Sequence, residues 1–183
     1  MLTKVFAHLF TFLRLLLVAP VALAFARPSS SLAKWALAML VIAIASDFAD
    51  GIAARRFATS SPAGMLFDHT TDCLFVTAGL TGCAISKATT PLLPAVVALA
   101  FAQYVLDSWF LHRSPVLRMS WLGRRNGIFY FVPLALVAIA RSGTPQPASA
   151  YVVKAACVLS YVLVASTLLS MLDRAMASVR ARA

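Results

Sequence analysis

The acidic residues of this chain are few, of one type and gathered in one region. All six are aspartates, and four of them lie between residues 47 and 72. These four, called the aspartate motif below, are Asp47, Asp50, Asp68 and Asp72. Within each half of the motif the spacing is three or four residues, which puts both carboxylates on one face of a helix. We expect two antiparallel helices, joined by a short loop, to direct the four carboxylates at one point.

A cluster of four carboxylates has a definite chemical use. The negative charges repel one another unless cations lie between them. Hard oxygen ligands suit Mg²⁺ or Mn²⁺, and four acids suffice for two such ions. A pair of ions is the recurring device for displacement at phosphorus, because it stabilises both the attacking and the leaving oxygen. Solvated helix-end acids without a task would explain one or two of the four but not their spacing, so the motif predicts a two-metal phosphotransferase site.

Small residues and one arginine stand beside the aspartate motif. Gly51 directly follows the second aspartate, and Gly64 lies one turn before the third. Glycine lets a ligand or a neighbouring backbone approach closely. Ala54 keeps the same helical face open, and Arg55 places a guanidinium where it suits a diphosphate. Each glycine alone would fit helix packing, but beside the acids they predict a substrate pocket.

The elements that position these residues are predicted to be membrane helices. Of the residues, 61% are hydrophobic and 12% are charged, whereas soluble domains carry about 25% charged residues. Apolar stretches long enough to cross a bilayer, roughly 20 residues each, recur along the chain. We expect six: 5–27, 34–54, 65–86, 91–111, 127–141 and 150–172. The predicted fold is an all-α integral membrane protein of a single domain, residues 1–183, with about six transmembrane helices and an amphipathic N-terminal helix segment.

The first segment also has features of a secretory signal peptide. Lys4, the apolar run 15–23 and the small residues of the triplet 24–26 fit that interpretation. The stretch before Arg14 is, however, too apolar for the positively charged region of a signal peptide. We therefore expect the segment to be retained as a membrane helix.

The net charge of +10 is explained by orientation in a membrane. With six spans and a cytoplasmic N-terminus, eleven of the 16 Lys and Arg residues fall on the cytoplasmic side. This distribution follows the positive-inside rule. We therefore expect both termini and the aspartate motif on the cytoplasmic side of a bacterial inner membrane. Anionic lipid head groups are the natural partner of such a surface, and no motif indicates nucleic acid.

The aspartate motif and its neighbours resemble the signature of the CDP-alcohol phosphatidyltransferase family. The chain reads Asp47-Phe-Ala-Asp50-Gly51-Ile-Ala-Ala54-Arg55, then eight residues, then Gly64-Met-Leu-Phe-Asp68-His-Thr-Thr-Asp72. Every fixed position of that signature is present. The stretch His8-Leu-Phe-Thr11-Phe-Leu-Arg14, with Pro20 beyond it, also resembles the amphipathic N-terminal helix of the family, although Asn usually stands where His8 is.

The resemblance implies a reaction and a role for each matching residue. Asp47, Asp50 and Asp68 would hold two divalent cations, Mg²⁺ or Mn²⁺, with Asp72 completing the second site. Asp72 would also be the general base that takes the proton from the acceptor hydroxyl. The acceptor oxygen would attack the β-phosphorus of a CDP-alcohol, and CMP would leave. The residues against the CDP moiety would be Gly51, Ala54, Arg55 and Gly64, and a homodimer is a further implication.

The acceptor alcohol is less constrained by the sequence. Acceptors in this family often carry a phosphate, which arginines at the cytoplasmic mouth would bind. The candidates are Arg113, Arg118, Arg124 and Arg125, which orientation in the membrane explains equally well. The stretch 120–124 resembles bacterial phosphatidylglycerophosphate synthases, and that activity, with CDP-diacylglycerol as donor, is the leading interpretation. Those enzymes usually carry Lys where this chain has Cys73, and an Arg-Glu pair where it has Leu106-Asp107.

Other functions stay open at this point. Residues 54–56 and 60–69 resemble choline and ethanolamine phosphotransferases, which are much longer chains and use diacylglycerol as acceptor. A small cation transporter would also place acids in the membrane, but it does not explain the glycines, Ala54 and Arg55. A non-catalytic member of the family is a third alternative, although no acid of the motif is missing.

Two further polar residues lie near the predicted site. His69 is expected to pack or to support the ligands, because adjacent positions on a helix point apart. Asp107 lies among apolar residues, where an acid is usually functional. We expect it to pair with Arg113 or Arg118, or to order the acceptor site.

Overall fold

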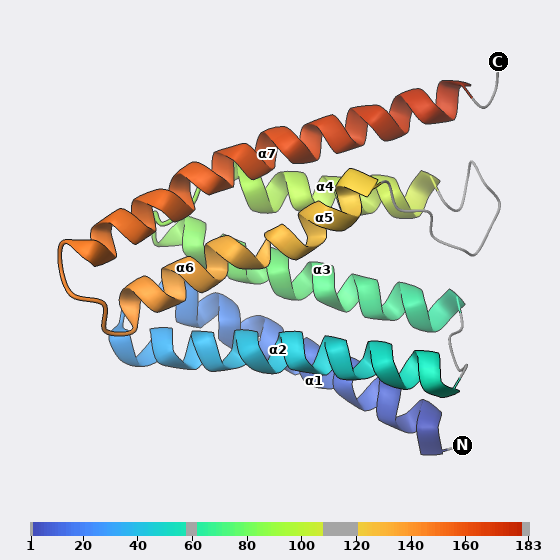
Figure 1. Cartoon of the computed structure of the whole chain (residues 1–183), viewed down its shortest axis with the longest axis horizontal. Coiled ribbons are helices and arrows are strands. Elements are labelled where there is room, and N and C mark those ends of the chain that lie inside the picture. Colours follow the sequence, from blue (N-terminus) through green and yellow to red (C-terminus); the bar gives the residue numbers. More distant parts are fainter. Residues whose placement is uncertain (1, 58–61, 108–120, 181–183) are drawn as a thin grey trace.

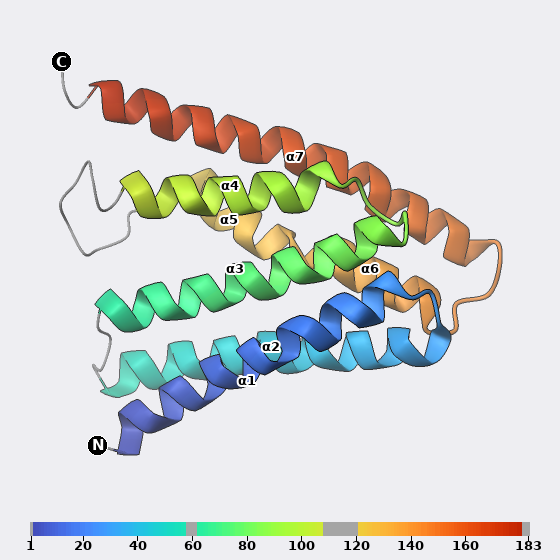
Figure 2. The ribbon, with the colours of Figure 1, turned by 180° about the vertical axis from the view of Figure 1, so that it is seen from behind.

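The chain folds into a bundle of helices that lie roughly along one direction (Figures 1 and 2). The computed structural model describes the backbone of residues 2–57, 62–107 and 121–180, and the side chains of 11–49, 64–107 and 121–176. The helices are α1 Leu2–Ala26, α2 Ser30–Phe57, α3 Pro62–Ile85, α4 Leu92–Leu106, α5 Trp121–Phe129, α6 Phe131–Arg141 and α7 Ala148–Arg180. The beginning of α1 and the end of α7 lie at the same end of the bundle, where α2 also ends and α3 begins.

The apolar character of the helices agrees with a membrane protein. Ser30–Ala49, Trp121–Arg141 and Ala148–Met176 are long and apolar enough to cross a membrane, and Thr11–Ala26 and Leu92–Leu106 are shorter apolar helices. Large side chains such as Trp35, Leu99 and Leu169 are at least 60% exposed, as expected of a surface that faces lipid. The all-α membrane fold predicted from the sequence is confirmed.

The predicted boundaries need one correction, in the fifth segment. Its helical structure starts at Trp121 rather than at 127, and it is broken at Tyr130 into α5 and α6. Pro133 gives the physical reason. A proline lacks the backbone N–H, and its ring clashes with the carbonyl four residues earlier, which is that of Phe129. The helix therefore ends at Phe129 and begins again at Phe131.

Helix α1 contacts both α2 and α3, and its close approach to α3 depends on a glycine. A Cβ atom on Gly82 would lie 2.4 Å from the carbonyl oxygen of Ala22 and 2.8 Å from Cβ of Phe25. Only glycine permits the two backbones to come this near. Buried Phe25, Phe75 and Leu80 fill the adjoining core. The contact between Gly82 and Ala22 sets the register of α1 against α3.

An arginine ties the same two helices together at their C-terminal ends. Arg141, at the end of α6, donates a 3.0 Å hydrogen bond to the carbonyl oxygen of Phe25 and another of 3.0 Å to Oγ of Ser86. The C-terminus of a helix leaves carbonyl groups without partners and carries partial negative charge, so a guanidinium is stabilising there. The aspartate motif lies toward the opposite end of α3, where Thr11 and Arg14 of α1 meet it.

Candidate active site

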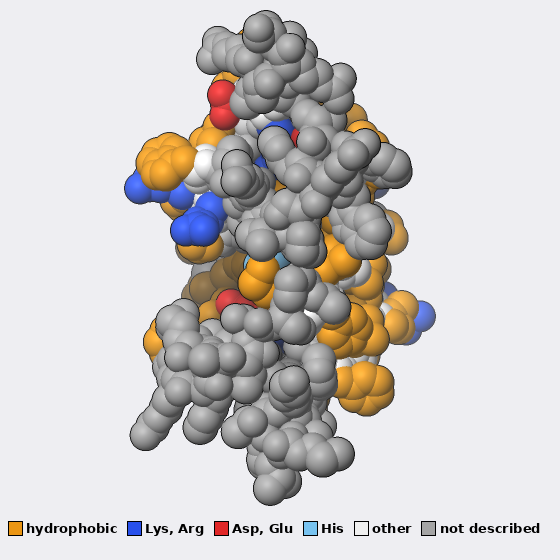
Figure 3. Space-filling view, turned by 90° about the vertical axis from the view of Figure 1, so that its right-hand side faces the viewer, with side chains coloured by type: hydrophobic (Ala, Val, Ile, Leu, Met, Phe, Trp, Pro, Cys, Tyr) orange, Lys and Arg blue, Asp and Glu red, His pale blue; other side chains and the backbone are white. Residues whose placement is uncertain are grey.

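The candidate site lies at the end of the bundle where α2 stops and α3 starts. In the views of the bundle, α2 runs antiparallel to α3, as the spacing of the aspartates predicts (Figures 1 and 2). The structure adds a third element, because α1 packs against both helices. Figure 3 looks onto this end of the bundle, where acidic and basic side chains appear among hydrophobic ones.

Three carboxylates of the aspartate motif converge on one arginine of α1. The guanidinium of Arg14 donates to Oδ1 of Asp68 at 2.5 Å and lies 3.5 Å from Oδ1 of Asp47. It also donates to Oδ1 of Asp72. Thr11, one turn earlier on α1, donates a 3.4 Å hydrogen bond to the same oxygen of Asp68. Helices α2 and α3 therefore present their acids to a cation supplied by α1.

The arginine lies inside the site and the carboxylates lie at its surface. The side chain of Arg14 is 1% exposed, whereas those of Asp68 and Asp72 are 28% and 29% exposed and that of Asp47 is 57% exposed. A ligand arriving from solvent thus meets carboxylates before it meets the guanidinium. Acids that keep this much exposure beside a buried cation stay available for a further positive ligand.

The donor set of the site fits a hard divalent cation. Ligand atoms of Asp68, His69 and Asp72 lie within 4.8 Å of one another. Carboxylate oxygens are the preferred ligands of Mg²⁺ and Mn²⁺, and a histidine nitrogen is compatible with Mn²⁺. From the sequence, His69 is expected to pack or to support the ligands. Its ring meets the ring of Tyr104 edge-on, with 6.4 Å between centroids, and it also lies beside the candidate ligand atoms of Asp68 and Asp72.

The remaining motif residues are placed by their backbone. Asp50, Gly51, Ala54 and Arg55 lie in the last turns of α2, and their side chains fall outside the described residues. Gly64 lies in the first turn of α3, one turn before Asp68. These residues therefore adjoin Asp47 and Asp68 along α2 and α3, and their assignment to a CDP pocket stays a prediction.

The four candidate acceptor arginines have different surroundings. Arg113 and Arg118 lie outside the described residues. Arg125 lies over the exposed ring of Trp121, 4.1 Å from its centroid. Arg124 is within electrostatic range of Tyr104, which in turn contacts His69. Of the two described arginines, Arg124 is therefore the one with an electrostatic interaction that reaches Tyr104, and its side chain is exposed.

A polar cluster between α4 and α7 adjoins the site through the contact of Tyr104 with His69, and of its members only Asp107 was singled out from the sequence. It consists of Gln103, Tyr104, Asp107 and Arg174. The guanidinium of Arg174 lies 4.9 Å from the centroid of the Tyr104 ring and interacts electrostatically with Asp107. Among the described residues, Oε1 of Gln103, Oδ2 of Asp107 and Nη1 of Arg174 are buried and have no hydrogen-bond partner. Buried polar atoms normally have partners, so this cluster is suited to a polar ligand.

Thr11 and Arg14 lie in the stretch that resembles the family's N-terminal helix, but their place among the carboxylates was not predicted. Arg14 is a charge inside an apolar segment, which usually marks a functional position, and the i, i+3 spacing of Thr11 and Arg14 puts them on one face. Arg174 lies in the last turns of a long apolar helix, where it looks like an ordinary cytoplasmic charge. Its distant partner on α4 gives no local signal. Asp107 has Arg174 near it, whereas its predicted partners, Arg113 and Arg118, lie outside the described residues.

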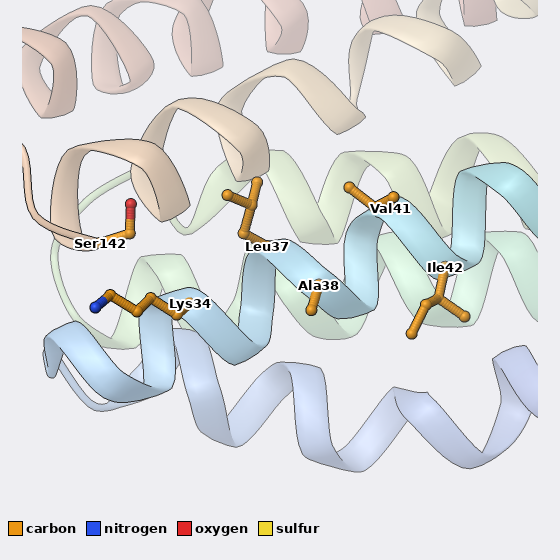
Figure 4. Close-up of a pocket in the computed structure, with 6 residues that line it drawn as sticks. All are labelled: Lys34, Leu37, Ala38, Val41, Ile42 and Ser142. Carbon is orange, nitrogen blue, oxygen red and sulfur yellow. The ribbon is translucent and has the colours of Figure 1, made fainter.

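An apolar groove elsewhere on the bundle is separate from the site. It measures about 550 Å³ and lies between α2 and the end of α6, lined by Lys34, Leu37, Ala38, Val41, Ile42 and Ser142 (Figure 4). Apart from Ser142, which follows α6, these residues belong to the first half of α2, whereas Asp47 lies in its second half. Because the groove presents mainly hydrocarbon and lies away from the carboxylates, it has no part in the chemistry described below.

Comparison with known proteins identifies the family. Residues 4–180, nearly the whole chain, match the family described as CDP-alcohol phosphatidyltransferase. Neither curated proteins nor solved structures gave a significant match. Members of this family are transferases of phospholipid synthesis and are bound to membranes. A helical membrane bundle with acids converging from α2 and α3 agrees with that match, and the chain belongs to the CDP-alcohol phosphatidyltransferase family.

Proposed function

We propose that the protein transfers the phosphatidyl group of CDP-diacylglycerol to the hydroxyl of a phosphorylated alcohol, releasing CMP. The single observation that carries the proposal is the convergence of Asp47, Asp68 and Asp72, from two helices, at one end of a membrane bundle. Arg14 offsets one of their three charges, and acids that remain uncompensated in an apolar bundle usually mark an ion or substrate site. A diphosphate donor with divalent cations fits such a site.

The aspartate motif is proposed to hold two divalent cations, Mg²⁺ or Mn²⁺. The exposed oxygens of the motif, and the cluster of Asp68, His69 and Asp72 within 4.8 Å, support this role. Bound cations supply charge neutralisation to the diphosphate and to the leaving nucleotide. The protein's own contribution is to hold the carboxylates on rigid helices, so that the substrate is positioned before reaction.

Asp72 is proposed as the general base. It takes the proton from the acceptor hydroxyl while that oxygen forms a bond to the β-phosphorus. The bond between the β-phosphorus and the bridging oxygen breaks, and the electron pair leaves with CMP. The side chain of Asp72 is 29% exposed, so an acceptor can approach it from the surface of the site, which is the geometric requirement of a general base.

The donor is proposed to bind along the facing turns of α2 and α3. Gly51, Ala54 and Gly64 offer little side chain, which leaves room for the cytidine and its diphosphate. Arg55 supplies a guanidinium for the diphosphate oxygens. The diacylglycerol tails would extend along the apolar surface of the bundle, where large side chains face outward.

The acceptor is proposed to bind in the polar cluster of α4 and α7. Arg174 lies against the Tyr104 ring, and Arg124 interacts with Tyr104 electrostatically. His69 connects that ring to the aspartate motif. Two guanidinium groups suit a phosphate, and the buried oxygen of Asp107 suits a hydroxyl of the same acceptor. Glycerol 3-phosphate, the acceptor of a phosphatidylglycerophosphate synthase, has both groups and is the leading candidate.

The membrane setting is proposed from the charge distribution. The predicted excess of basic residues puts the site at the cytoplasmic face of a bacterial inner membrane, where both substrates are present. The homodimer implied by the family is proposed with it, and purification in detergent with mass determination tests it.

CMP release from CDP-diacylglycerol, measured with a panel of acceptors, tests the function. The panel comprises glycerol 3-phosphate, serine, inositol phosphate, phosphatidylglycerol and diacylglycerol, each with Mg²⁺ and with Mn²⁺. Turnover with glycerol 3-phosphate is expected. Turnover with another acceptor would correct the substrate, and an enzyme that uses CDP-choline with diacylglycerol belongs to the alternative class. If the purified protein turns over no CDP-alcohol with any acceptor, the proposed activity is wrong.

A further inference from the structure

Arg14 belongs to a helix that contributes no acid to the aspartate motif, yet it occupies the point where three of those acids meet. Its guanidinium contacts Asp68 at 2.5 Å, Asp47 at 3.5 Å and also Asp72. At 1% exposure it is effectively withdrawn from water. A buried charge is tolerated only when it is paired and hydrogen bonded. The carboxylates provide that pairing, and in return Arg14 offsets their mutual repulsion.

Arg14 occupies carboxylate oxygens of residues that could also hold a divalent cation. Its hydrogen bonds end on Oδ1 of Asp68 and Oδ1 of Asp72, two residues of the group whose ligand atoms lie within 4.8 Å. A small divalent cation needs carboxylate oxygens at about 2.0–2.1 Å. A guanidinium and a cation cannot both take the same oxygens at their preferred distances, and their positive charges repel.

We propose that Arg14 is a tethered counter-cation of the metal site. In the metal-free protein it holds the carboxylates of α2 and α3 together. When divalent cations bind, its hydrogen bonds to Asp68 and Asp72 break. The inference rests on the metal site of the proposed function. It adds that Arg14 competes with the divalent cations for the carboxylates of that site. One guanidinium against three carboxylates leaves a net negative charge, so the site still attracts cations. The role of Arg14 is positioning, exerted through the carboxylates.

The proposal makes two opposite predictions for one substitution. In Arg14→Gln the carboxylates lose their partner, so the metal-free protein is less stable. The same change removes a positive charge that opposes the metal, so cations bind more tightly. A residue with an ordinary structural role would produce the first effect without the second.

The test uses the full-length protein in detergent or nanodiscs, without substrate. Binding of Mn²⁺ is followed by electron paramagnetic resonance, and thermal unfolding is measured with and without Mn²⁺. We expect R14Q to bind Mn²⁺ roughly tenfold more tightly than the wild type, the equivalent of one charged hydrogen bond. Its melting temperature should be lower without Mn²⁺, and the rise on adding Mn²⁺ should be larger than for the wild type.

Arg141→Gln is the matched control. Arg141 also donates hydrogen bonds from a helix of the bundle, to Phe25 and Ser86, but it lies at the other end of α1 and α3. R141Q should lower the melting temperature equally with and without Mn²⁺, and its affinity for Mn²⁺ should equal that of the wild type. A shift in affinity in R141Q as large as in R14Q would overturn the proposal, because the effect would then be general.

The other outcomes are equally decisive. Unchanged or weaker Mn²⁺ binding by R14Q, beside normal binding by the wild type, refutes the competition and leaves the metal site in place. R14Q that is recovered folded only with Mn²⁺ supports the proposal, since the metal then replaces the arginine. R14Q that cannot be recovered even with Mn²⁺ refutes it. A wild-type protein that binds no Mn²⁺ removes the metal site and the inference together.

Discussion

The guanidinium carbon of Arg174 on α7 lies 4.9 Å from the centroid of the Tyr104 ring on α4. The same ring meets that of His69, which lies between the two aspartates of α3. The ring of Tyr104 thus connects Arg174, on the last helix, to His69 beside the aspartate motif. Changes at Arg174 should consequently affect the acceptor half of the reaction more than the donor half.

Arg174→Gln is expected to raise the KM for a phosphorylated acceptor. Loss of a hydrogen bond to a charged group costs about 1.5–3 kcal/mol, so kcat/KM for glycerol 3-phosphate should fall roughly 10- to 100-fold. The KM for CDP-diacylglycerol should change little. Steady-state CMP release with each substrate varied in turn measures both values.

Arg125→Gln serves as the control for that prediction. Arg125 lies over the exposed ring of Trp121, and an exposed contact of this kind contributes only about 0.5–1 kcal/mol. Its kinetic constants should stay near those of the wild type. If R125Q, and not R174Q, raises the KM for the acceptor, the acceptor site lies at α5 and the polar cluster is wrongly assigned.

Asp72→Asn should nearly abolish turnover. The amide cannot accept the proton of the acceptor hydroxyl, and general base catalysis contributes roughly 10²–10⁴-fold to the rate. The exposed acid Asp173 on α7 provides a matched Asp→Asn change outside the site, and D173N should retain wild-type kcat. If kcat persists in D72N, another group is the base.

Removal of divalent cations should stop the reaction and leave the fold intact. Chelation is expected to reduce CMP release to background, with recovery on adding Mg²⁺ or Mn²⁺. Far-ultraviolet circular dichroism should show the same helix content before and after, because α1, α2 and α3 are also held by packing and by Arg14. Full activity in excess chelator would contradict the two-metal site.

Gly82→Ala should destabilise the contact between α1 and α3. The added Cβ would meet the carbonyl oxygen of Ala22 at 2.4 Å, and relieving such overpacking typically costs about 1–3 kcal/mol. A lower melting temperature in detergent is expected. Gly127→Ala is the control, because nothing lies within 4 Å of its added Cβ. That change should be neutral or slightly stabilising, and equal losses in both variants would rule out the steric explanation.

The part of the site that local helical geometry determines could be predicted from the sequence. The apolar composition predicted the helical membrane fold. The spacing within the aspartate motif predicted that acids of α2 and α3 lie close together. The part that depends on tertiary packing could not. Nothing in the spacing of Asp47 and Asp68 indicates that α1 contacts both helices, or that Arg14 lies between them.

The polar cluster of α4 and α7 also depends on tertiary packing, between residues that are farther apart in the sequence, and it could not be predicted for the same reason. Tyr104 and Arg174 are far apart in the chain, and each taken alone is ordinary for the end of a membrane helix. Only the packing of α4 on α7 gives them a joint role. The break at Tyr130, by contrast, had a local signal in Pro133, because the effect of a proline on the preceding turn depends on backbone chemistry alone.

The close contact of Gly82 on α3 with Ala22 and Phe25 makes that end of α1 a fulcrum. Arg14 lies eleven residues before Phe25, so at 1.5 Å per residue the lever arm is about 16 Å. Tilting α1 by about 5° about that fulcrum displaces Arg14 by about 1.4 Å, which exceeds the difference between a hydrogen bond and a metal–oxygen bond. The guanidinium can therefore leave the carboxylates by a small rigid tilt of one helix, with no unfolding of its turns.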